Sequence, residues 1–367
     1  MPEQIYISPD HHTRKIESIE MGRGLAALAV LLLHAEGMLL PARAFEHAGF
    51  GGVFRYGFLG VDFFFVLSGF IIFFTHQRDL GIPARTGNYI LRRLFRILPA
   101  YWAVFAMMLI LLPFQKNWPD ISLAWLSLQL SLTDLELWVG QAWTLQHEFI
   151  FYGLFVFAIW HKHIGILLIA LWASACMAIN WGAEDVERGS FTQILFHPYH
   201  VMFILGMISA YVYRVGGRLW YGWLALSFSV STLLVVRMID IGDDFRSHSF
   251  LRYAASAGMS NTVLLGLLVY ANFKLPVPHL FAWLGKISYS VYLAHGVVLM
   301  AVSGLIERLG LQTILPRPII FIAGVGICIF VSAILQRLIE QPGVDLGKRI
   351  TRWFSAKIDR GRLTSPL

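Results

Sequence analysis

Charged residues are scarce in this chain: Asp, Glu, Lys and Arg make up 14% of its 367 residues. A soluble domain carries about 25% charged residues and about 45–50% apolar ones. Here 57% of the residues are hydrophobic, and the mean hydropathy is +0.64. The composition therefore excludes an ordinary soluble domain and predicts an integral membrane protein.

Cysteine is also rare, and no cleavable leader is recognisable. The two cysteines, Cys176 and Cys328, both lie in apolar runs, which disfavours a disulfide framework or a zinc site. The first dozen residues contain no apolar run of the kind found in a signal peptide. We therefore expect the first apolar helix to stay in the mature protein as a membrane anchor.

Histidine spacing gives no strong metal signal either. His161 and His163, like His197 and His200, are spaced loosely as metal ligands can be. No set of carboxylates or thiolates accompanies either pair, and such a set would be needed to complete a metal site. We expect no bound metal.

Positive charge is in excess, with a net charge of +7 and an isoelectric point near 9.5. In a membrane protein such an excess marks cytoplasmic loops and contacts with anionic lipid headgroups. We therefore expect membrane lipids among the partners of this chain, and no nucleic acid.

Apolar runs of spanning length recur along the chain, separated by polar breaks. We expect an all-α integral membrane protein with about ten transmembrane helices. The expected spans are 23–40, 58–76, 97–113, 145–160, 164–180, 200–213, 219–236, 254–272, 287–305 and 318–336. The moderately apolar stretch within 114–144 is interrupted by Asp134 and Glu136, and we expect it to be re-entrant or interfacial.

Basic residues follow alternate loops of this arrangement. With the N-terminus inside, the cytoplasmic connections hold most of the Lys and Arg, while 184–187 and 240–244 form acidic loops on the other side. This is the bias that the positive-inside rule describes. It predicts that both termini are cytoplasmic. We expect a cytoplasmic segment 1–22, a transmembrane domain 23–340, and a basic cytoplasmic tail 341–367. Within this tail, residues 349–367 are expected to be disordered or to lie on the membrane surface.

The first apolar helix carries Arg23 near its start and His34 deep inside. Eleven residues at about 100° each place both side chains on one face, about 16 Å apart along the axis. With Arg23 at the interface, His34 lies near the middle of the bilayer, where ionisable groups are costly and usually functional. The alternative is a core histidine bonded to a neighbouring helix.

Three later spans also carry buried polar groups. Asp62 and Ser68 lie in the second span, and Glu148 and Tyr152 lie at i and i+4 of the fourth. This spacing puts Glu148 and Tyr152 on one face, which must point into the bundle if Glu148 is to avoid lipid. A polar stripe within 287–295 adds further hydroxyls and a histidine. Plain helix packing and interhelical hydrogen bonding are the alternative for each group.

Arg92, Arg93 and Arg96 form a cationic face at the start of the third span. Arginine suits phosphate because its planar guanidinium makes bidentate bonds and stays charged. Lipid anchoring and topology are the alternative for such a juxtamembrane cluster.

Together these pieces resemble the membrane acyltransferase family 3, which includes bacterial O-antigen, peptidoglycan and exopolysaccharide O-acetylases. The resemblance runs from about residue 16 to 342, and the ordered set of motifs is specific although each motif alone is weak. The segments 16–20 and 142–152 are most similar to the exopolysaccharide-acetylase branch. The motifs are 16–20, Arg23 with His34, 60–70, 93–96, 142–152 and 287–295.

The resemblance implies ten helices, with residues 23–340 as the acyltransferase domain, in the bacterial inner membrane. It also implies an acyl-CoA donor on the cytoplasmic side, most simply acetyl-CoA, and a carbohydrate hydroxyl of a surface or exopolysaccharide precursor as acceptor. Carried over residue by residue, it gives catalytic roles to His34 and Glu148. The residues expected to bind donor or acceptor are Arg23, Asp62, Ser68, Arg93, Arg96, Tyr152, Tyr292 and His295. Further copies of the chain or polysaccharide-assembly proteins are candidate partners.

The chemistry of acyl transfer fits these residues. A sugar hydroxyl needs a base, for which a neutral imidazole such as His34 is suited, and an acyl-imidazole intermediate is the alternative role. The thioester oxygen needs donors as it gains charge, and Tyr152, Ser68 or a nearby cation could serve. The rival function is a proton-coupled transporter of a glycan or small metabolite, because buried His, Asp and Glu also form proton relays. The sequence shows no paired halves of the kind that transporters contain.

The topology can be tested with reporter fusions. A reporter fused after Leu367 should be cytoplasmic, because ten spans put both chain ends on one side. A reporter inserted near Asp243 should be extracytoplasmic, because three expected spans separate it from the C-terminus. Alkaline phosphatase and green fluorescent protein fusions measure this directly. Finding both reporters on the same side would overturn the helix count.

Overall fold

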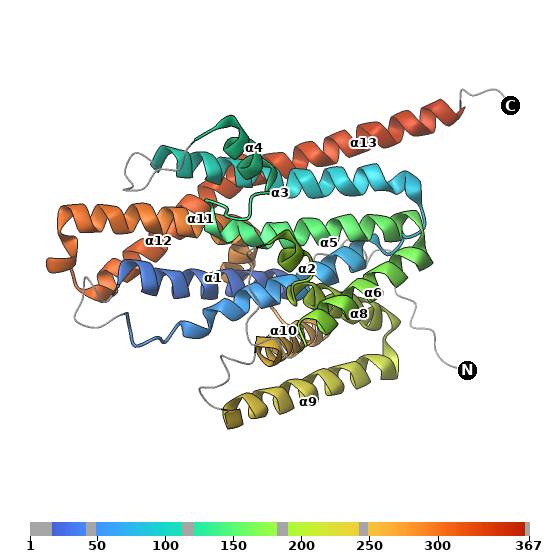
Figure 1. The fold of residues 1–367 in the computed structure, drawn as a ribbon, viewed down its shortest axis with the longest axis horizontal. Coiled ribbons are helices and arrows are strands. Elements are labelled where there is room, and N and C mark those ends of the chain that lie inside the picture. The colour runs from blue at the N-terminus through green and yellow to red at the C-terminus, as the bar shows by residue number, and fades with distance from the viewer. Residues whose placement is uncertain (1–16, 42–48, 112–120, 182–189, 242–248, 364–367) are drawn as a thin grey trace.

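The computed structural model describes residues 17–41, 49–111, 121–181, 190–241 and 249–363. Within these residues every regular element is a helix, and most helices run along the long axis of the molecule (Figure 1). Several expectations concern residues outside these ranges. They are the acidic loop 184–187, residues 242–244 of the second acidic loop (including Asp243), residues 1–16, the start of the 114–144 stretch, and residues 364–367.

Ten helices among the described residues are long and apolar enough to cross a membrane, which confirms the expected number and the all-α class. They begin with α1 (Glu17–Leu39), which is followed in order by the other nine. These are α2 (Leu59–His76), α3 (Thr86–Leu111), α5 (Trp143–Trp160), α6 (Lys162–Ile179), α8 (Tyr199–Val215), α9 (Gly217–Ile241), α10 (Ser249–Asn272), α11 (His279–Leu309) and α12 (Arg317–Leu335).

Several helices extend past the apolar runs that predict them. Helix α1 begins six residues before Arg23, and α11 begins at His279 although its apolar run starts near residue 287. Polar residues at the ends of a span can continue the helix, because their side chains reach the interface while the backbone stays hydrogen-bonded. Hydropathy therefore located the spans correctly but predicted several helices to be shorter than they are.

The stretch within 114–144 contains α4 (Leu123–Ser131), which is too short to cross a membrane. Ser122 caps its first turn by accepting a hydrogen bond from the Trp125 amide at 3.1 Å. The hydroxyl of Tyr101 in α3 donates to the Gln129 carbonyl at 2.6 Å. This helix is therefore attached to the side of α3, in keeping with a segment that does not span. A second short helix, α7 (Phe191–Leu195), precedes α8.

The C-terminal part of the chain differs from the expected tail. Helix α12 continues through one π-helical turn, η8 (Gln336–Glu340), into α13 (Gln341–Leu363), so the expected boundary at residue 340 falls inside a continuous helix. The start of α13 packs on α3, where a Cβ at Gly347 would lie 2.6 Å from the Phe95 side chain. Farther along, α13 extends beyond the other helices (Figure 1). The first turns of α13 therefore belong to the bundle.

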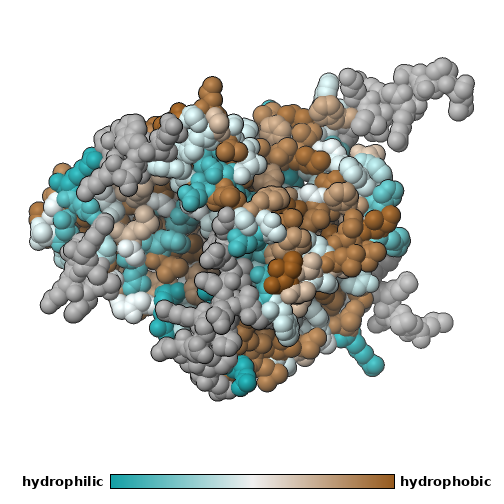
Figure 2. Space-filling model, in the orientation of Figure 1, coloured by the Kyte–Doolittle hydropathy of each residue, from teal (hydrophilic) through white to brown (hydrophobic). Residues whose placement is uncertain are grey.

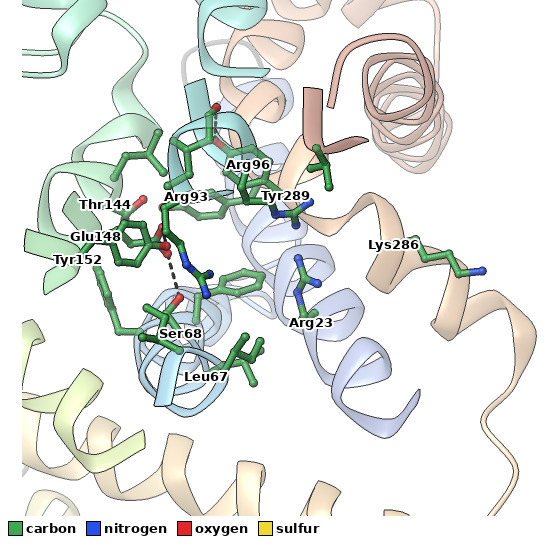
Figure 3. A pocket seen from close by; sticks show the side chains of 18 of the residues that line it. Arg23, Leu67, Ser68, Arg93, Arg96, Thr144, Glu148, Tyr152, Lys286 and Tyr289 are labelled. Atoms are coloured by element: carbon green, nitrogen blue, oxygen red, sulfur yellow. Dashed lines mark hydrogen bonds between the residues drawn. The ribbon is translucent and has the colours of Figure 1, made fainter. Parts of the chain in front are cut away.

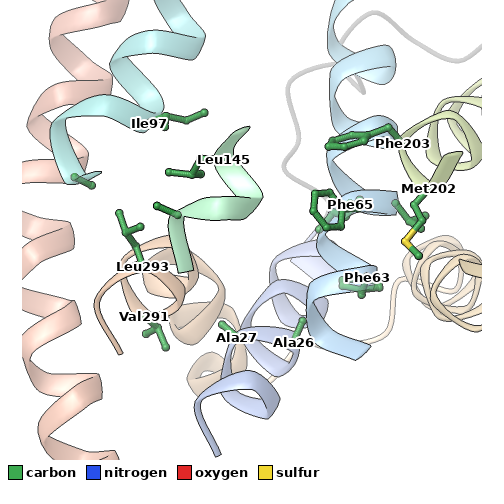
Figure 4. Close-up of a cluster of buried hydrophobic side chains, with 14 of the residues drawn as sticks. Ala26, Ala27, Phe63, Phe65, Ile97, Leu145, Met202, Phe203, Val291 and Leu293 are labelled. Carbon is green, nitrogen blue, oxygen red and sulfur yellow. The ribbon is translucent and has the colours of Figure 1, made fainter. Parts of the chain in front are cut away.

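Two helix pairs form the centre of the bundle: α1 packs along α11, and α2 packs along α8. Buried side chains from these four helices meet in a continuous apolar core, part of which is drawn in Figure 4. The α2–α8 contact is unusually close. A Cβ at Gly206 would lie 1.9 Å from the Val66 carbonyl oxygen, and one at Gly69 would lie 1.8 Å from the Phe203 carbonyl oxygen. Glycine thus lets the two backbones touch, as in many membrane helix pairs.

The outer surface is apolar where lipid would contact it. In Figure 2 hydrophobic side chains cover the middle and right of the visible face, and hydrophilic ones gather toward the left end and the right edge. Helices α6 and α9 are the least buried of the spanning helices. Both expose large aliphatic and aromatic side chains, including Leu167, Leu171, Phe228 and Leu233. In a bilayer these residues face hydrocarbon, which makes their exposure favourable.

The α2–α8 contact predicts a sharp difference between two glycine substitutions. Gly206→Ala should lower the stability of the folded protein by about 1–3 kcal/mol, because the added methyl group overlaps a backbone carbonyl that cannot rotate away. Gly222→Ala in α9 is the matched control, since a Cβ there meets nothing within 4 Å. Thermal unfolding of the purified proteins in detergent measures the stability of both variants. Equal melting temperatures for Gly206→Ala and Gly222→Ala would contradict the close α2–α8 contact.

Candidate active site

A cavity of about 570 Å³ lies where α1, α2, α3, α5, α11 and the α12–α13 junction meet. Five basic and two acidic side chains line it, so the cavity favours an anionic ligand. Its polar lining consists of Glu20, Arg23, Ser68, Arg93, Arg96, Thr144, Glu148, Tyr152, Lys286, Tyr289, Tyr292, Gln336, Gln341 and Lys348.

Three arginines from two helices converge on this cavity. Figure 3 shows the guanidinium groups of Arg23 on α1 and of Arg93 and Arg96 on α3 pointing toward one open space, while Lys286 points away from it. The three therefore lie together in the structure. Arg92, their neighbour in sequence, is exposed and does not line the cavity. The cationic face expected from spacing is thus divided between the cavity and the surface.

The three arginines differ in how their charges are balanced. Arg23 forms a salt bridge with Glu20 one turn earlier, at 3.3 Å. Arg96 forms a salt bridge with Glu340, whose side chain is only 1% exposed. Arg93 makes no salt bridge among the described residues. Its guanidinium carbon lies over the rings of Tyr89 and Tyr152 at 5.7 and 5.5 Å, and its Nε is buried without a hydrogen-bond partner.

Glu148 lies opposite Arg93 and is held by two hydroxyl groups. The Ser68 hydroxyl donates to Oε1 and the Tyr152 hydroxyl donates to Oε2, each at 2.9 Å. Helix α5 presents Glu148 and Tyr152 on one face, as their i, i+4 spacing predicts. Both hydroxyls donate to the carboxylate here. The stabilisation of the thioester oxygen by Tyr152, Ser68 or a nearby cation stays a prediction.

The cavity changes character along its length. Lys286, Gln341 and Lys348 are exposed at one side. At the other, Thr144 and Tyr292 are each 7% exposed. The Phe64 ring contacts the Tyr292 ring with a centroid separation of 5.6 Å. The cavity therefore leads from a charged mouth to an aromatic inner end.

His34 lies beyond this inner end and is not among the residues that line the cavity. The ring of Tyr292 lies 5.9 Å from that of His295, which in turn lies 4.9 Å from the ring of His34. Helix α1 thus presents Arg23 to the cavity and His34 to a histidine of α11, three turns deeper. Two of the predicted residues, Tyr292 and His295, form the connection between these places.

Both histidines have one ring nitrogen fixed by a backbone carbonyl. His34 Nδ1 lies 2.9 Å from the Val30 oxygen, and His295 Nδ1 lies 3.2 Å from the Val291 oxygen. A carbonyl oxygen only accepts, so each Nδ1 carries the proton and donates. In the neutral ring Nε2 is then an acceptor, and the Nε2 of His295 is buried with no hydrogen-bond partner. This tautomer leaves Nε2 of each ring free to take a proton or to attack.

Asp62 is the one predicted site residue that lies away from both places. It is buried in α2 and faces Ser256 and Arg252 of α10, and it does not line the cavity. Its neighbour Val61 lines the cavity instead, because adjacent residues of a helix point about 100° apart.

Sequence reasoning missed Glu340 and Glu20 as parts of the site. Glu340 closes an apolar run just before Pro342, a place where a lone carboxylate is costly unless it is paired. That signal could have identified it. Its partner on α3 is more than two hundred residues away in sequence, so the pairing itself required the fold.

The histidine pairs with loose metal-ligand spacing lie in different environments. His161 and His163 are exposed. His200 is buried, and its Nε2 lies 2.8 Å from the Ile194 oxygen and 3.2 Å from Nδ1 of His147. In the part of the chain that the structure describes, no group of three or more His, Cys, Asp or Glu side chains is placed to hold a metal ion.

Comparisons with known proteins identify the family of the chain. Residues 16–337 match the Acyl_transf_3 family, which is described as "Acyltransferase domain". The chain is also similar to the "Exopolysaccharide production protein ExoZ" of Rhizobium meliloti (strain 1021). The two are 25% identical over 329 residues, which cover 84% of this chain and 96% of that protein. No solved structure matches the chain.

Proposed function

The chain belongs to the membrane acyltransferase family 3, and from that premise we propose that it is an O-acyltransferase that uses acyl-CoA, most simply acetyl-CoA. The proposed acceptor is a carbohydrate hydroxyl of a bacterial surface or exopolysaccharide precursor, a choice supported by the similarity to a protein named for exopolysaccharide production. The proposed location is the inner membrane. Family membership favours acyl transfer over the transporter alternative.

The convergence of Arg23, Arg93 and Arg96 on one cavity is the observation that carries the proposed donor. Coenzyme A carries several phosphates, and guanidinium groups bind phosphate through charge-assisted, often bidentate hydrogen bonds. A cavity of about 570 Å³ lies within the range of about 300–1,000 Å³ typical of small-molecule sites. Arg93 is the strongest candidate for a phosphate ligand, because no carboxylate among the described residues pairs with it.

The path from the cavity to His34 supports delivery of the acyl group at the inner end. The extended pantetheine arm of the donor would run past Ser68 and Thr144 toward Tyr292. Beyond Tyr292 the rings of His295 and His34 follow at 5.9 and 4.9 Å. The arginines would thus hold the phosphates while the thioester points toward the histidine pair.

His34 would then act at the reacting bond. As a base, its Nε2 takes the proton of the sugar hydroxyl while that oxygen attacks the thioester carbonyl carbon. The carbon–sulfur bond breaks, and the thiolate of coenzyme A leaves and takes up the proton. As a nucleophile, Nε2 attacks the thioester carbonyl carbon, the carbon–sulfur bond breaks, and the coenzyme A thiolate leaves. The sugar hydroxyl then attacks the acyl-imidazole, the carbon–nitrogen bond breaks, and the hydroxyl proton passes to the thiolate. Either route uses the ring nitrogen that the Val30 contact leaves free. Glu148 would orient Ser68 and Tyr152 beside the donor, and the catalytic role expected of it stays a prediction.

Replacing His34 tests the catalytic assignment. His34→Ala should abolish measurable acyl transfer; if His34 acts as a base, the rate should fall by a factor of at least about 10². Membrane insertion should stay intact, because Ala suits a transmembrane helix. His163→Ala is the matched control, since His163 is exposed. Incorporation of radiolabelled acetyl from acetyl-CoA into candidate glycans measures both. Substantial transfer by a well-inserted His34→Ala protein would contradict the assignment.

Charge-conserving substitutions test the donor site. Arg93→Lys and Arg96→Lys should each weaken acetyl-CoA binding about tenfold or more, because Lys keeps the charge but lacks the bidentate fork. Rescue of transfer at high donor concentration should be partial, since a misplaced thioester also reacts more slowly.

Arg214→Lys is the control for these variants, because Arg214 lies at the end of α8 outside the cavity. It should bind acetyl-CoA as the unaltered protein does when measured by equilibrium dialysis. Normal binding by both α3 variants together with a loss in Arg214→Lys would move the donor site to the α8–α9 connection.

A further inference from the structure

Glu340 is a buried carboxylate to which the proposed reaction gives no task. It is the last residue of the single π turn η8, and its side chain is 1% exposed. An unpaired carboxylate at such a depth would be strongly unfavourable. Single π turns are rare and frequently occur at functional sites. The identity of the groups that satisfy Glu340 therefore indicates what the turn is for.

Both oxygens of Glu340 have partners, and the partners come from two other helices. Oε1 accepts a hydrogen bond from Nη1 of Arg96 in α3, and Oε2 accepts one from the Ser290 hydroxyl of α11 at 2.6 Å. The π turn thus joins three helices at one carboxylate. The hydrogen bond from Ser290 holds the Glu340 carboxylate in one orientation. The carboxylate in turn holds the edge of the Arg96 guanidinium in place.

The face of the same guanidinium is also fixed. Its carbon lies 5.3 Å from the centroid of the Tyr289 ring, and the Tyr289 hydroxyl donates to the Ile97 carbonyl at 3.0 Å. Arg96 therefore cannot rotate freely. A guanidinium has five N–H donors, and those that Glu340 does not use remain for the cavity into which Arg96 points (Figure 3).

Glu340 itself does not line the cavity, although Gln336 and Gln341 on either side of it in sequence do. It contacts the cavity through Arg96. Its negative charge is thus separated from an anionic ligand by the guanidinium, so it orients the cation without lying next to the phosphates. Arg93 has no such support, since two tyrosine rings hold it instead.

We propose that Glu340 is a positioning residue that, braced by Ser290, aims the free N–H groups of Arg96 at the phosphates of the acyl-CoA donor. This inference rests on the proposed function, because it assumes that the cavity binds the donor. It assigns the π turn a role in substrate binding that a continuous α-helix could not provide, since the turn shifts the direction in which residue 340 points.

A double-mutant cycle on the full-length protein in detergent tests the proposal, with coenzyme A as the titrated ligand. Glu340→Gln keeps the shape of the side chain and removes its charge, and it should raise the dissociation constant about tenfold by releasing Arg96. In an Arg96→Gln background the same change should alter the constant less than about twofold, because Glu340 acts through Arg96. The double variant should also recover part of the melting temperature lost in Glu340→Gln, since no buried charge is left unpaired.

Asp345→Asn supplies the matched control, because this carboxylate of α13 is half exposed and does not line the cavity. The Asp345→Asn protein should bind coenzyme A with the same dissociation constant as the unaltered protein. The proposal would be overturned if the two single substitutions had multiplicative effects on the dissociation constant of coenzyme A. It would also be overturned if Glu340→Gln lost stability but bound coenzyme A normally, because Glu340 would then have a purely structural role. Failure of the unaltered protein to bind coenzyme A would instead overturn the donor assignment on which the proposal depends.

Discussion

The constraint on which this structure depends is the free-energy penalty of placing charge within the thickness of a membrane. The spanning helices contain few charged residues, and several of those that line the cavity are balanced by a neighbour. Arg23 pairs with Glu20, Arg96 pairs with Glu340, and Glu148 accepts two hydroxyl hydrogen bonds. Among the described residues of the lining, Arg93 and the exposed Lys286 depart from this pattern, and of the two only Arg93 points into the cavity. An unbalanced cation beside a cavity is what an anionic ligand would complete.

The helix pairs that build the bundle also set the order of groups along the proposed reaction path. Helix α1 packs along α11, which puts Arg23 at the cavity and His34 against His295. Helix α2 packs so closely on α8, through Gly69 and Gly206, that its other face is free to present Ser68 to Glu148 of α5. The packing of the apolar core thus sets where the polar groups on other parts of the same helices point.

Sequence reasoning predicted the helical class and the number of spans, because both depend on local properties. Several of the residues it selected line the cavity. Long apolar runs identify spans wherever they occur, and the spacing of Arg23 and His34 or of Glu148 and Tyr152 fixes which side chains share a face. It failed where the answer depends on a partner helix. Nothing local to Asp62 indicates that it faces α10, and nothing local to Glu340 indicates that α3 supplies its cation. The continuation of α12 into α13 was also missed, since a polar amphipathic helix has no apolar run to mark it.

The difference between Arg93 and Arg96 suggests a division of tasks that follows from electrostatics. A cation already neutralised by a buried carboxylate has little net charge to offer, but its geometry is fixed, so it contributes direction. A cation held by aromatic faces keeps its full charge and some freedom, so it contributes attraction. A phosphate entering the cavity would be drawn mainly by Arg93 and oriented mainly by Arg96. If the proposed donor binds in this way, its acyl group would pass Tyr292 on the way to His34, so the orientation set at the arginines would decide whether the thioester comes within reach of Nε2.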